Sequence, residues 1–361
     1  MKWKKLPLPL WTIAAPISAW VIYLINSSPE NGVFSFLLAF VLIASVIAAV
    51  HHAEVIAHRV GEPYGTLVLA IAITVIEVAL VVSLMLAGGA ETTALARDTV
   101  FAAIMIILTG IIGLCLLVGG FRYKEQTFGT YGVSAALITL TAISVLTLVL
   151  PNYTTSVAGP VYSSSQLIFV AIVSLVLYGA FVMIQTVRHR DYFLPAEEAT
   201  TEDAHASPPS NLVAGLSLIL LILCLVAVVL IAKALAPGIE NTVLRLGAPK
   251  SLVGVIVAFV ILLPEGLAAL RAARNNRLQT SLNLALGSAL ASIGLTIPAV
   301  AIVSIFTGLT VTLGIDTKSI VLMILSLFTI MVSLATGKTN MLQGIVLLVI
   351  FAVYLFTTVV P

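Results

Sequence analysis

The sequence predicts an all-α polytopic membrane protein with about eleven transmembrane helices, arranged as two inverted five-helix repeats and one extra N-terminal helix. Apolar residues make up 60% of the chain and charged residues only 9%, whereas an ordinary soluble domain is about 25% charged. Apolar runs of about 20 residues, the length that crosses the hydrocarbon core, recur throughout. A sequence motif also occurs once in each half, and it divides the chain in two.

The apolar runs predict eleven membrane spans. They cover residues 9–26, 33–56, 64–88, 99–120, 131–150, 166–187, 212–235, 250–271, 281–307, 318–335 and 340–360. The first run follows a basic start like that of a signal peptide, but no small-residue cleavage site follows it. We therefore expect it to be retained as the first span.

The basic residues predict the orientation. With the N terminus inside, the inner connections hold 12 of the 17 Lys and Arg residues and the outer connections hold the other 5. Cytoplasmic connections carry such an excess, so we expect a multi-pass protein of the bacterial inner membrane with its N terminus inside. The net charge of +2 then reflects topology, and we expect no nucleic acid partner. Cys115 and Cys224 fall in predicted spans, where packing is expected and a disulfide is not.

An internal repeat relates the two halves. Residues 54–63 (EVIAHRVGEP) and 240–249 (ENTVLRLGAP) share Glu, Arg, Gly and Pro at the same spacing. Each copy precedes one long apolar span that holds a single internal glutamate, Glu77 or Glu265. The copies begin five spans apart, and because five is odd the halves must be inverted in the membrane. Inverted-repeat transporters form their ion sites near the midplane, where the halves meet.

The repeat gives the expected organisation of the chain. It comprises an extra N-terminal helix (1–30), a first five-helix repeat (31–187), an acidic cytoplasmic linker (188–211) and a second five-helix repeat (212–361). The acidic residues of the linker either attract cations or only keep the segment solvated. They are Glu197, Glu198, Glu202 and Asp203.

Glu77 and Glu265 are the candidate ion-binding and proton-exchanging residues. A carboxylate in the middle of a span costs a few kcal/mol, so it is expected to face protein or water and to serve a function, although a structural hydrogen bond is the alternative. Thr74 lies one turn before Glu77 and adds a hydroxyl on the same face. Pro264 precedes Glu265, breaks the hydrogen bonding of its helix and frees a carbonyl near Ile261.

The ninth span adds a polar stripe to this site. Ser288, Ser292 and Thr296 follow one another at four-residue spacing, with Asn283 about a turn away and Gly287 expected to allow a close approach. The stripe either lines the ion site or mediates ordinary helix packing. Two carboxylates with hydroxyls and carbonyls form an all-oxygen site, which suits a hard cation such as Ca²⁺.

The repeated motif also supplies a candidate gate or structural lock. Glu54 with Arg59, and Glu240 with Arg245, occupy equivalent places in the two halves. A cluster of histidines near the first pair either relays protons or holds the end of the helix. These are His51, His52 and His58.

Several segments resemble the cation/proton exchangers of the cation/Ca²⁺ exchanger superfamily, in particular the bacterial ChaA-type Ca²⁺/H⁺ antiporters. The segments are HRVGEPYGTLVLAIAITVIEVAL (58–80), LLPEGLAALRAARNNRLQTSLNLALGSALASIGLTIPAV (262–300), GGFRYKEQTFG (119–129) and TGKTNMLQG (336–344). The resemblance implies that Glu77 and Glu265 bind the ion and exchange protons.

The chain departs from the calcium exchanger pattern around both acids. Those exchangers carry Gly-Asn shortly before each glutamate, whereas this chain has Ile73-Thr74 and Ile261-Leu262. A glutamine expected in the ninth span is replaced by Ala291. Fewer side-chain oxygens leave the choice among Ca²⁺, Na⁺ and K⁺ open.

The sequence therefore predicts a secondary active antiporter that exports Ca²⁺, or Na⁺ or K⁺, in exchange for H⁺. The alternatives are a passive cation channel and a mainly monovalent cation/proton antiporter. We expect no enzymatic activity, no bound cofactor and no resident metal beyond the transported ion. The expected partners are membrane lipid, inorganic cations and protons, and a homo-oligomer remains open.

Overall fold

The structure is a computed structural model that describes residues 8–25, 32–61, 64–88, 92–194, 209–245, 247, 249 and 251–360. Within these ranges nine helices are long and apolar enough to cross a membrane, and two shorter apolar helices, Leu10–Ile25 and Ile71–Leu86, accompany them. They coincide with the eleven predicted spans. The prediction of an all-α polytopic membrane protein is confirmed.

The helices of the N-terminal half are α1 (Leu10–Ile25), α2 (Gly32–Val60), α3 (Tyr64–Gly88), α4 (Leu95–Met105), η2 (Ile106–Ile111), α5 (Ile112–Tyr123), α6 (Thr130–Ser144), η3 (Val145–Val149), η4 (Leu150–Tyr153), α7 (Ser164–Met183), η5 (Ile184–Arg188) and η6 (Arg190–Phe193). Those of the C-terminal half are α8 (Asn211–Arg245), α9 (Ser251–Arg274), α10 (Leu278–Thr307), α11 (Thr317–Leu334) and α12 (Met341–Val359). Two short strands, β1 (Glu125–Thr127) and β2 (Lys338–Asn340), also lie among the described residues.

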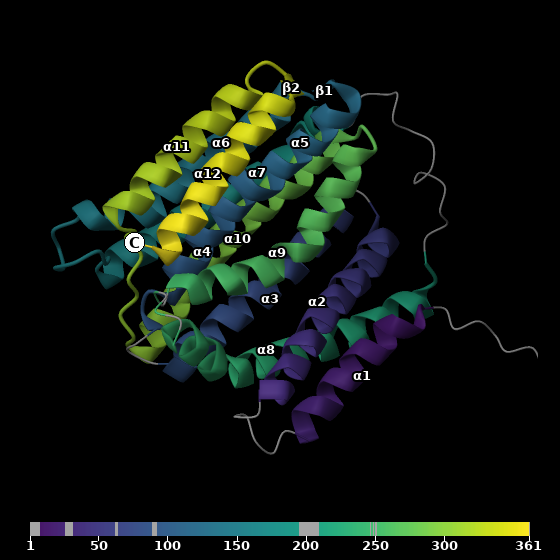
Figure 1. The fold of residues 1–361 in the computed structure, drawn as a ribbon, viewed down its shortest axis with the longest axis vertical. Helices are drawn as coiled ribbons and strands as arrows, with labels where there is room; N and C mark the ends of the chain where they lie inside the picture. Colours follow the sequence, from purple (N-terminus) through teal and green to yellow (C-terminus); the bar gives the residue numbers. More distant parts are fainter. Residues whose placement is uncertain are drawn as a thin grey trace, which may run out of the picture. The chain divides into compact units, whose positions relative to one another are not determined.

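The helices form two compact units (Figure 1). The first unit contains α1, α2, α3 and α8, and within it α2 packs against both α1 and α8. The second unit contains the other elements, with α9 packed against α4 and α10. Helix α8 comes from the second sequence repeat but packs with α1 and α2, which end at Ile25 and Val60, far earlier in the chain.

The repeated motif lies at the ends of two helices. The predicted second and seventh spans continue beyond the expected boundaries, so that α2 reaches Val60 and α8 reaches Arg245. The glycine of each motif copy follows, and both glycines are left-handed, with φ of 76° at Gly61 and 71° at Gly247. Glycine adopts this conformation without steric strain and commonly ends a helix. The motif therefore encodes a helix stop in each half.

Among the described residues, three membrane helices contain a wider π-helical turn, which the sequence did not predict. These turns are η2 after α4, η3 after α6 and η5 after α7. In η2 the N–H of Ile112 bonds to the carbonyl of Ile107, five residues earlier. Such bulges are rare and frequently occur at functional sites.

Two helix pairs in the second unit pack in the same way. Helix α5 packs on α12, and α10 packs on α7. The predicted repeat makes α5 the counterpart of α10 and α12 the counterpart of α7, so one kind of packing occurs twice. Glycine permits the close approach in both pairs, because a Cβ at Gly344 would lie 2.4 Å from the backbone nitrogen of Leu117 and one at Gly294 would lie 2.8 Å from Tyr178.

The small sheet joins two connections that the sequence places on the same side of the membrane. Strand β1 pairs antiparallel with β2, with Gln126 opposite Thr339. Six predicted spans separate the two connections, and an even number of crossings returns the chain to the same side. The sheet qualifies the all-α prediction.

Both cysteines are buried and free, as expected.

Candidate ion-binding residues

Glu77 is buried in the middle of α3, in the first unit. Its side chain is 3% exposed, and that of Thr74, one turn earlier, is also 3% exposed. Ile71, Val75 and Leu86 are exposed on the other face. The helical period therefore separates an outward apolar face from a buried face that holds the carboxylate and the hydroxyl.

Glu265 is buried in the middle of α9, in the second unit. Its side chain is 8% exposed, and Ile261, one turn earlier, is 3% exposed. Gly266 directly follows Glu265, and a Cβ at Gly266 would lie 3.2 Å from the side chain of Ile111 in η2. The π-helical turn thus packs beside the position of this acid.

Pro264 does not break α9, contrary to the expectation from the sequence. The helix is continuous from Ser251 to Arg274 with the proline inside it. Proline has no N–H, so the carbonyl of Val260, four residues earlier, still lacks its usual donor. Packing of α9 against α4 and α10 holds the helix together across this position.

The polar stripe of α10 divides into two parts. Ser292 is 3% exposed and Thr296 is fully buried, while Ser288 is half-buried. Asn283 holds the beginning of the linker, because its Nδ2 donates to the carbonyl of Phe193 at 2.6 Å and its Oδ1 accepts from Gln279 at 3.0 Å. Its amide is therefore engaged in a structural contact within the second unit.

The expected close approach at Gly287 is wrong. A Cβ at this position would meet no described atom within 4 Å. Gly294, two turns later on the same helix, makes the close contact instead, against Tyr178. Both glycines lie on one face of α10, but the neighbouring helix α7 comes close enough to require a glycine only at Gly294.

Of the candidate gate residues, Glu54 and Arg59 lie exposed near the end of α2. Nη2 of Arg59 donates to Oδ1 of Asn211, the first residue of α8. The interaction ties the end of α2 to the start of its neighbour. Glu240 and Arg245 lie in the last turns of α8, and their side chains are outside the described residues, as are linker residues 195–208.

Comparison with known proteins identifies the family. The sodium/calcium exchanger protein family matches residues 31–187 and 216–360. The chain belongs to this family. A candidate ionic transporter of Sinorhizobium fredii, y4hA, is 47% identical to this chain, over 98% of this chain and 97% of its own length. The sodium-potassium/proton antiporter ChaA of Escherichia coli is 37% identical over 89% of this chain and 87% of its own.

A solved structure shares the fold. The crystal structure of the H⁺/Ca²⁺ exchanger CAX superposes with a TM-score of 0.73 over 96% of this chain and 88% of that one, at 16% sequence identity. The chain is therefore a multi-pass membrane protein of a transporter family, and the resemblance to cation/proton exchangers is confirmed.

In the exchanger, His52 connects the extra helix α1 to α2. Its ring is fully buried, and Nε2 lies 3.1 Å from the carbonyl of Thr12. That carbonyl is available because Pro16, four residues later, has no N–H to donate to it. A carbonyl only accepts, so Nε2 of His52 carries a proton and donates to it.

We predict that His52→Leu destabilises the exchanger by about 1–3 kcal/mol, because it leaves the Thr12 carbonyl buried without a donor. Thermal unfolding of the purified protein in detergent measures the change. His58→Leu is the matched control, since His58 is exposed on the same helix, and its effect is expected to stay within about 0.5 kcal/mol. Equal melting temperatures for the two variants would contradict this role of His52.

Sequence reasoning missed two features of the second unit. One is the ion pair of Arg97 and Asp98 at the start of α4. The other is Thr109 in η2, which is fully buried and donates to the carbonyl of Met105. A closer comparison of the repeats could have found Thr109, because Leu108-Thr109 matches Leu295-Thr296 in the other half.

Proposed function

We propose that the exchanger is a secondary active antiporter that expels a cation in exchange for protons, with Glu77 and Glu265 as the exchanging groups. The observation that carries this proposal is the burial of one glutamate in the middle of a membrane helix in each repeat, at 3% and 8% exposure. A carboxylate at that depth needs a counter-charge. A cation or a proton can provide it, and competition between the two couples their movements.

The proposed principal ion is Ca²⁺. Two carboxylates balance the charge of one divalent ion, and carboxylate, hydroxyl and carbonyl oxygens suit a hard cation. The solved CAX structure carries the name of an H⁺/Ca²⁺ exchanger, which supports this choice. We place the protein in the bacterial inner membrane with its N terminus inside, on the distribution of basic residues.

A mainly monovalent antiporter is the second candidate. The Escherichia coli relative is named a sodium-potassium/proton antiporter. At the two asparagine positions of the calcium exchanger pattern this chain also has Thr74 and Leu262, and Leu262 offers no side-chain oxygen. A site with fewer oxygen ligands satisfies Ca²⁺ less well, because Ca²⁺ takes six to eight of them.

Proteoliposomes that contain a pH-sensitive dye and a proton gradient test the proposal. Addition of the transported cation is expected to discharge the gradient, whereas a cation that is not transported leaves it intact. We expect the largest response to Ca²⁺ and smaller responses to Na⁺ and K⁺. A response to none of them would reject antiport, and a response to Na⁺ and K⁺ alone would favour the second candidate.

We predict that Pro264→Ala weakens cation binding while the protein stays folded. Alanine restores an N–H that bonds to the Val260 carbonyl, and this oxygen is then less available to an ion. The apparent KM for the cation is expected to rise about two- to tenfold, the effect of one hydrogen bond. An unchanged KM in the dye assay would exclude a role for this carbonyl.

A further inference from the structure

The small sheet of the second unit carries an exposed group of basic residues, together with the end of α5 (Figure 1). They are Arg122 near the end of α5, Lys124 just before β1 and Lys338 in β2, and all three side chains are exposed. The antiparallel register places Lys338 opposite Thr127, three residues after Lys124. We call the three basic residues the sheet cluster.

Neutral side chains between these cations fix the segment to the end of α9. Oη of Tyr123 donates to the carbonyl of Arg274 at 2.9 Å. Nε2 of Gln126, which is buried, donates to the carbonyl of Ala273 and to Oδ1 of Asn276, both at 3.0 Å. The neutral residues therefore hold the segment in place, and the basic residues are left on the surface.

The positive charge of the sheet cluster is not neutralised by the protein. Glu125 is the acid beside it, and among the described residues no ion pair joins Glu125 to any of the three cations. The guanidinium of Arg122 lies 5.5 Å from the ring centroid of Tyr123, a contact that keeps its charge. Three cations and one acid leave a net charge of +2 at this surface.

Exposed apolar side chains adjoin the sheet cluster. Phe121 on α5 is 82% exposed and Leu342 on α12 is 65% exposed. The two helices meet here, because a Cβ on Gly120 would lie 2.4 Å from the backbone nitrogen of Met341. Aromatic residues and basic residues at the end of a membrane helix are typical of the boundary between hydrocarbon and headgroups. One surface therefore offers both apolar contact and positive charge.

Lys124 has a strained backbone conformation. Its φ is 67° and its ψ is −59°, and among the described non-glycine residues only Asn276 shares a positive φ. Glycine adopts such angles without a steric penalty. Strain of this kind persists only where the surroundings enforce it, and it is concentrated at functional and ligand sites. The chain thus keeps a basic side chain at a position where glycine would be easier to accommodate.

We propose that the sheet cluster binds the phosphate headgroup of an anionic phospholipid. In the proposed topology the sheet lies on the cytoplasmic side, where the leaflet carries anionic lipids. The phosphate accepts hydrogen bonds from Arg122, Lys124 and Lys338. An acyl chain of the same lipid lies along Phe121 and Leu342. The inference goes beyond the proposed antiport, and loss of antiport would leave it standing.

Native mass spectrometry of the purified exchanger tests the proposal. Phosphatidylglycerol and phosphatidylcholine with the same acyl chains are added at equal concentrations, and phosphatidylglycerol is expected to bind more tightly. Arg122→Gln and Lys338→Gln are each expected to weaken phosphatidylglycerol binding about fivefold, the effect of one basic residue near an anionic surface. Binding of phosphatidylcholine is expected not to change. Equal affinities of the wild type for the two lipids would overturn the proposal.

Substitution of Lys124 separates lipid binding from stability. Lys124→Gly is expected to keep or raise the melting temperature, because glycine relieves the backbone strain. The same variant is expected to bind phosphatidylglycerol about fivefold more weakly. A Lys124→Gly protein that binds this lipid as tightly as the wild type would remove Lys124 from the site.

Matched variants and a soluble anion complete the test. Arg190→Gln removes an exposed cation from η6, which packs on α6 and η5, and it is expected to keep the wild-type lipid affinity. Glu125→Gln removes the neighbouring acid and is expected to raise that affinity. Inorganic phosphate at the lipid concentration is expected not to displace phosphatidylglycerol. Displacement by phosphate, or an equal loss of affinity in Arg190→Gln, would contradict a specific lipid site.

Discussion

Replacement of either buried glutamate by glutamine is expected to reduce cation/proton exchange to the level of vesicles that lack the protein. Glutamine has nearly the same size as glutamate, so packing around Glu77 and Glu265 is preserved. It carries neither a negative charge for the cation nor an exchangeable proton at this depth. The loss is therefore expected in the maximal rate at every cation concentration, and the dye assay with proteoliposomes measures it.

Two controls belong to this experiment. Glu125→Gln makes the same chemical change at an exposed position of β1 and is expected to leave exchange unchanged. Thermal unfolding shows whether each variant is folded. A folded Glu77→Gln or Glu265→Gln protein that still exchanges a cation for protons would remove that residue from the mechanism.

Replacement of Gly344 by alanine is expected to destabilise the exchanger by about 1–3 kcal/mol, the usual effect of overpacking. The new Cβ would lie 2.4 Å from the backbone nitrogen of Leu117 and 2.7 Å from the carbonyl of Gly113. Backbone atoms cannot rotate away as a flexible side chain can, so α5 and α12 must separate. Gly120→Ala is expected to act similarly, because its Cβ would lie 2.4 Å from the backbone nitrogen of Met341.

Gly179→Ala is the matched control for these substitutions. Gly179 lies inside α7, and a Cβ there would meet no described atom within 4 Å. Alanine is therefore expected to be neutral or to stabilise the helix by up to about 1 kcal/mol. The melting temperature in detergent measures all three variants. A Gly344→Ala protein as stable as Gly179→Ala would contradict the close packing of α5 and α12.

Most of the fold follows from the sequence because each span is set by its own residues. A run of about 20 apolar residues must form a helix in a bilayer, since no water is present to bind its backbone groups. The repeated motif was also informative, because Gly61 and Gly247 end helices through a local conformation. Side-chain burial at Glu77 and Glu265 agrees with their depth in the predicted spans.

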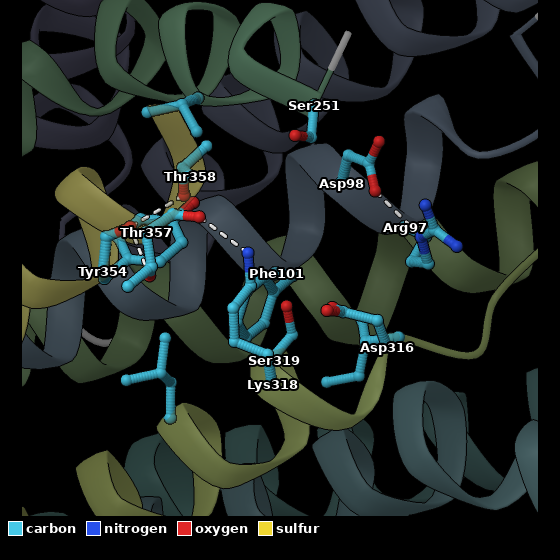
Figure 2. A pocket seen from close by; sticks show the side chains of 13 residues that line it. Arg97, Asp98, Phe101, Ser251, Asp316, Lys318, Ser319, Tyr354, Thr357 and Thr358 are labelled. Carbon is cyan, nitrogen blue, oxygen red and sulfur yellow. Dashed lines mark hydrogen bonds and ion pairs between the residues drawn. The ribbon is translucent and has the colours of Figure 1, made fainter. Parts of the chain in front are cut away.

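The features that sequence reasoning missed depend on helices distant in the chain. A pocket in the second unit joins residues near positions 97, 251, 316 and 357 (Figure 2), and no local pattern relates them. The sequence places Asn283 in a polar stripe, but its amide donates a hydrogen bond to the carbonyl of Phe193, 90 residues away. Gly287 and Gly294 are alike in sequence, and only the packing of α7 distinguishes them. The π-helical turns likewise had no sequence signal.

Uphill movement of Ca²⁺ in liposomes containing only the purified protein tests the central claim most directly. With an acidic interior and no membrane potential, proton efflux is predicted to drive radioactive Ca²⁺ inward until its internal concentration exceeds the external one. Collapse of the pH gradient with an ammonium salt is then predicted to release it. Accumulation that stops at equal concentrations, with or without the pH gradient, would show a passive cation channel and contradict antiport.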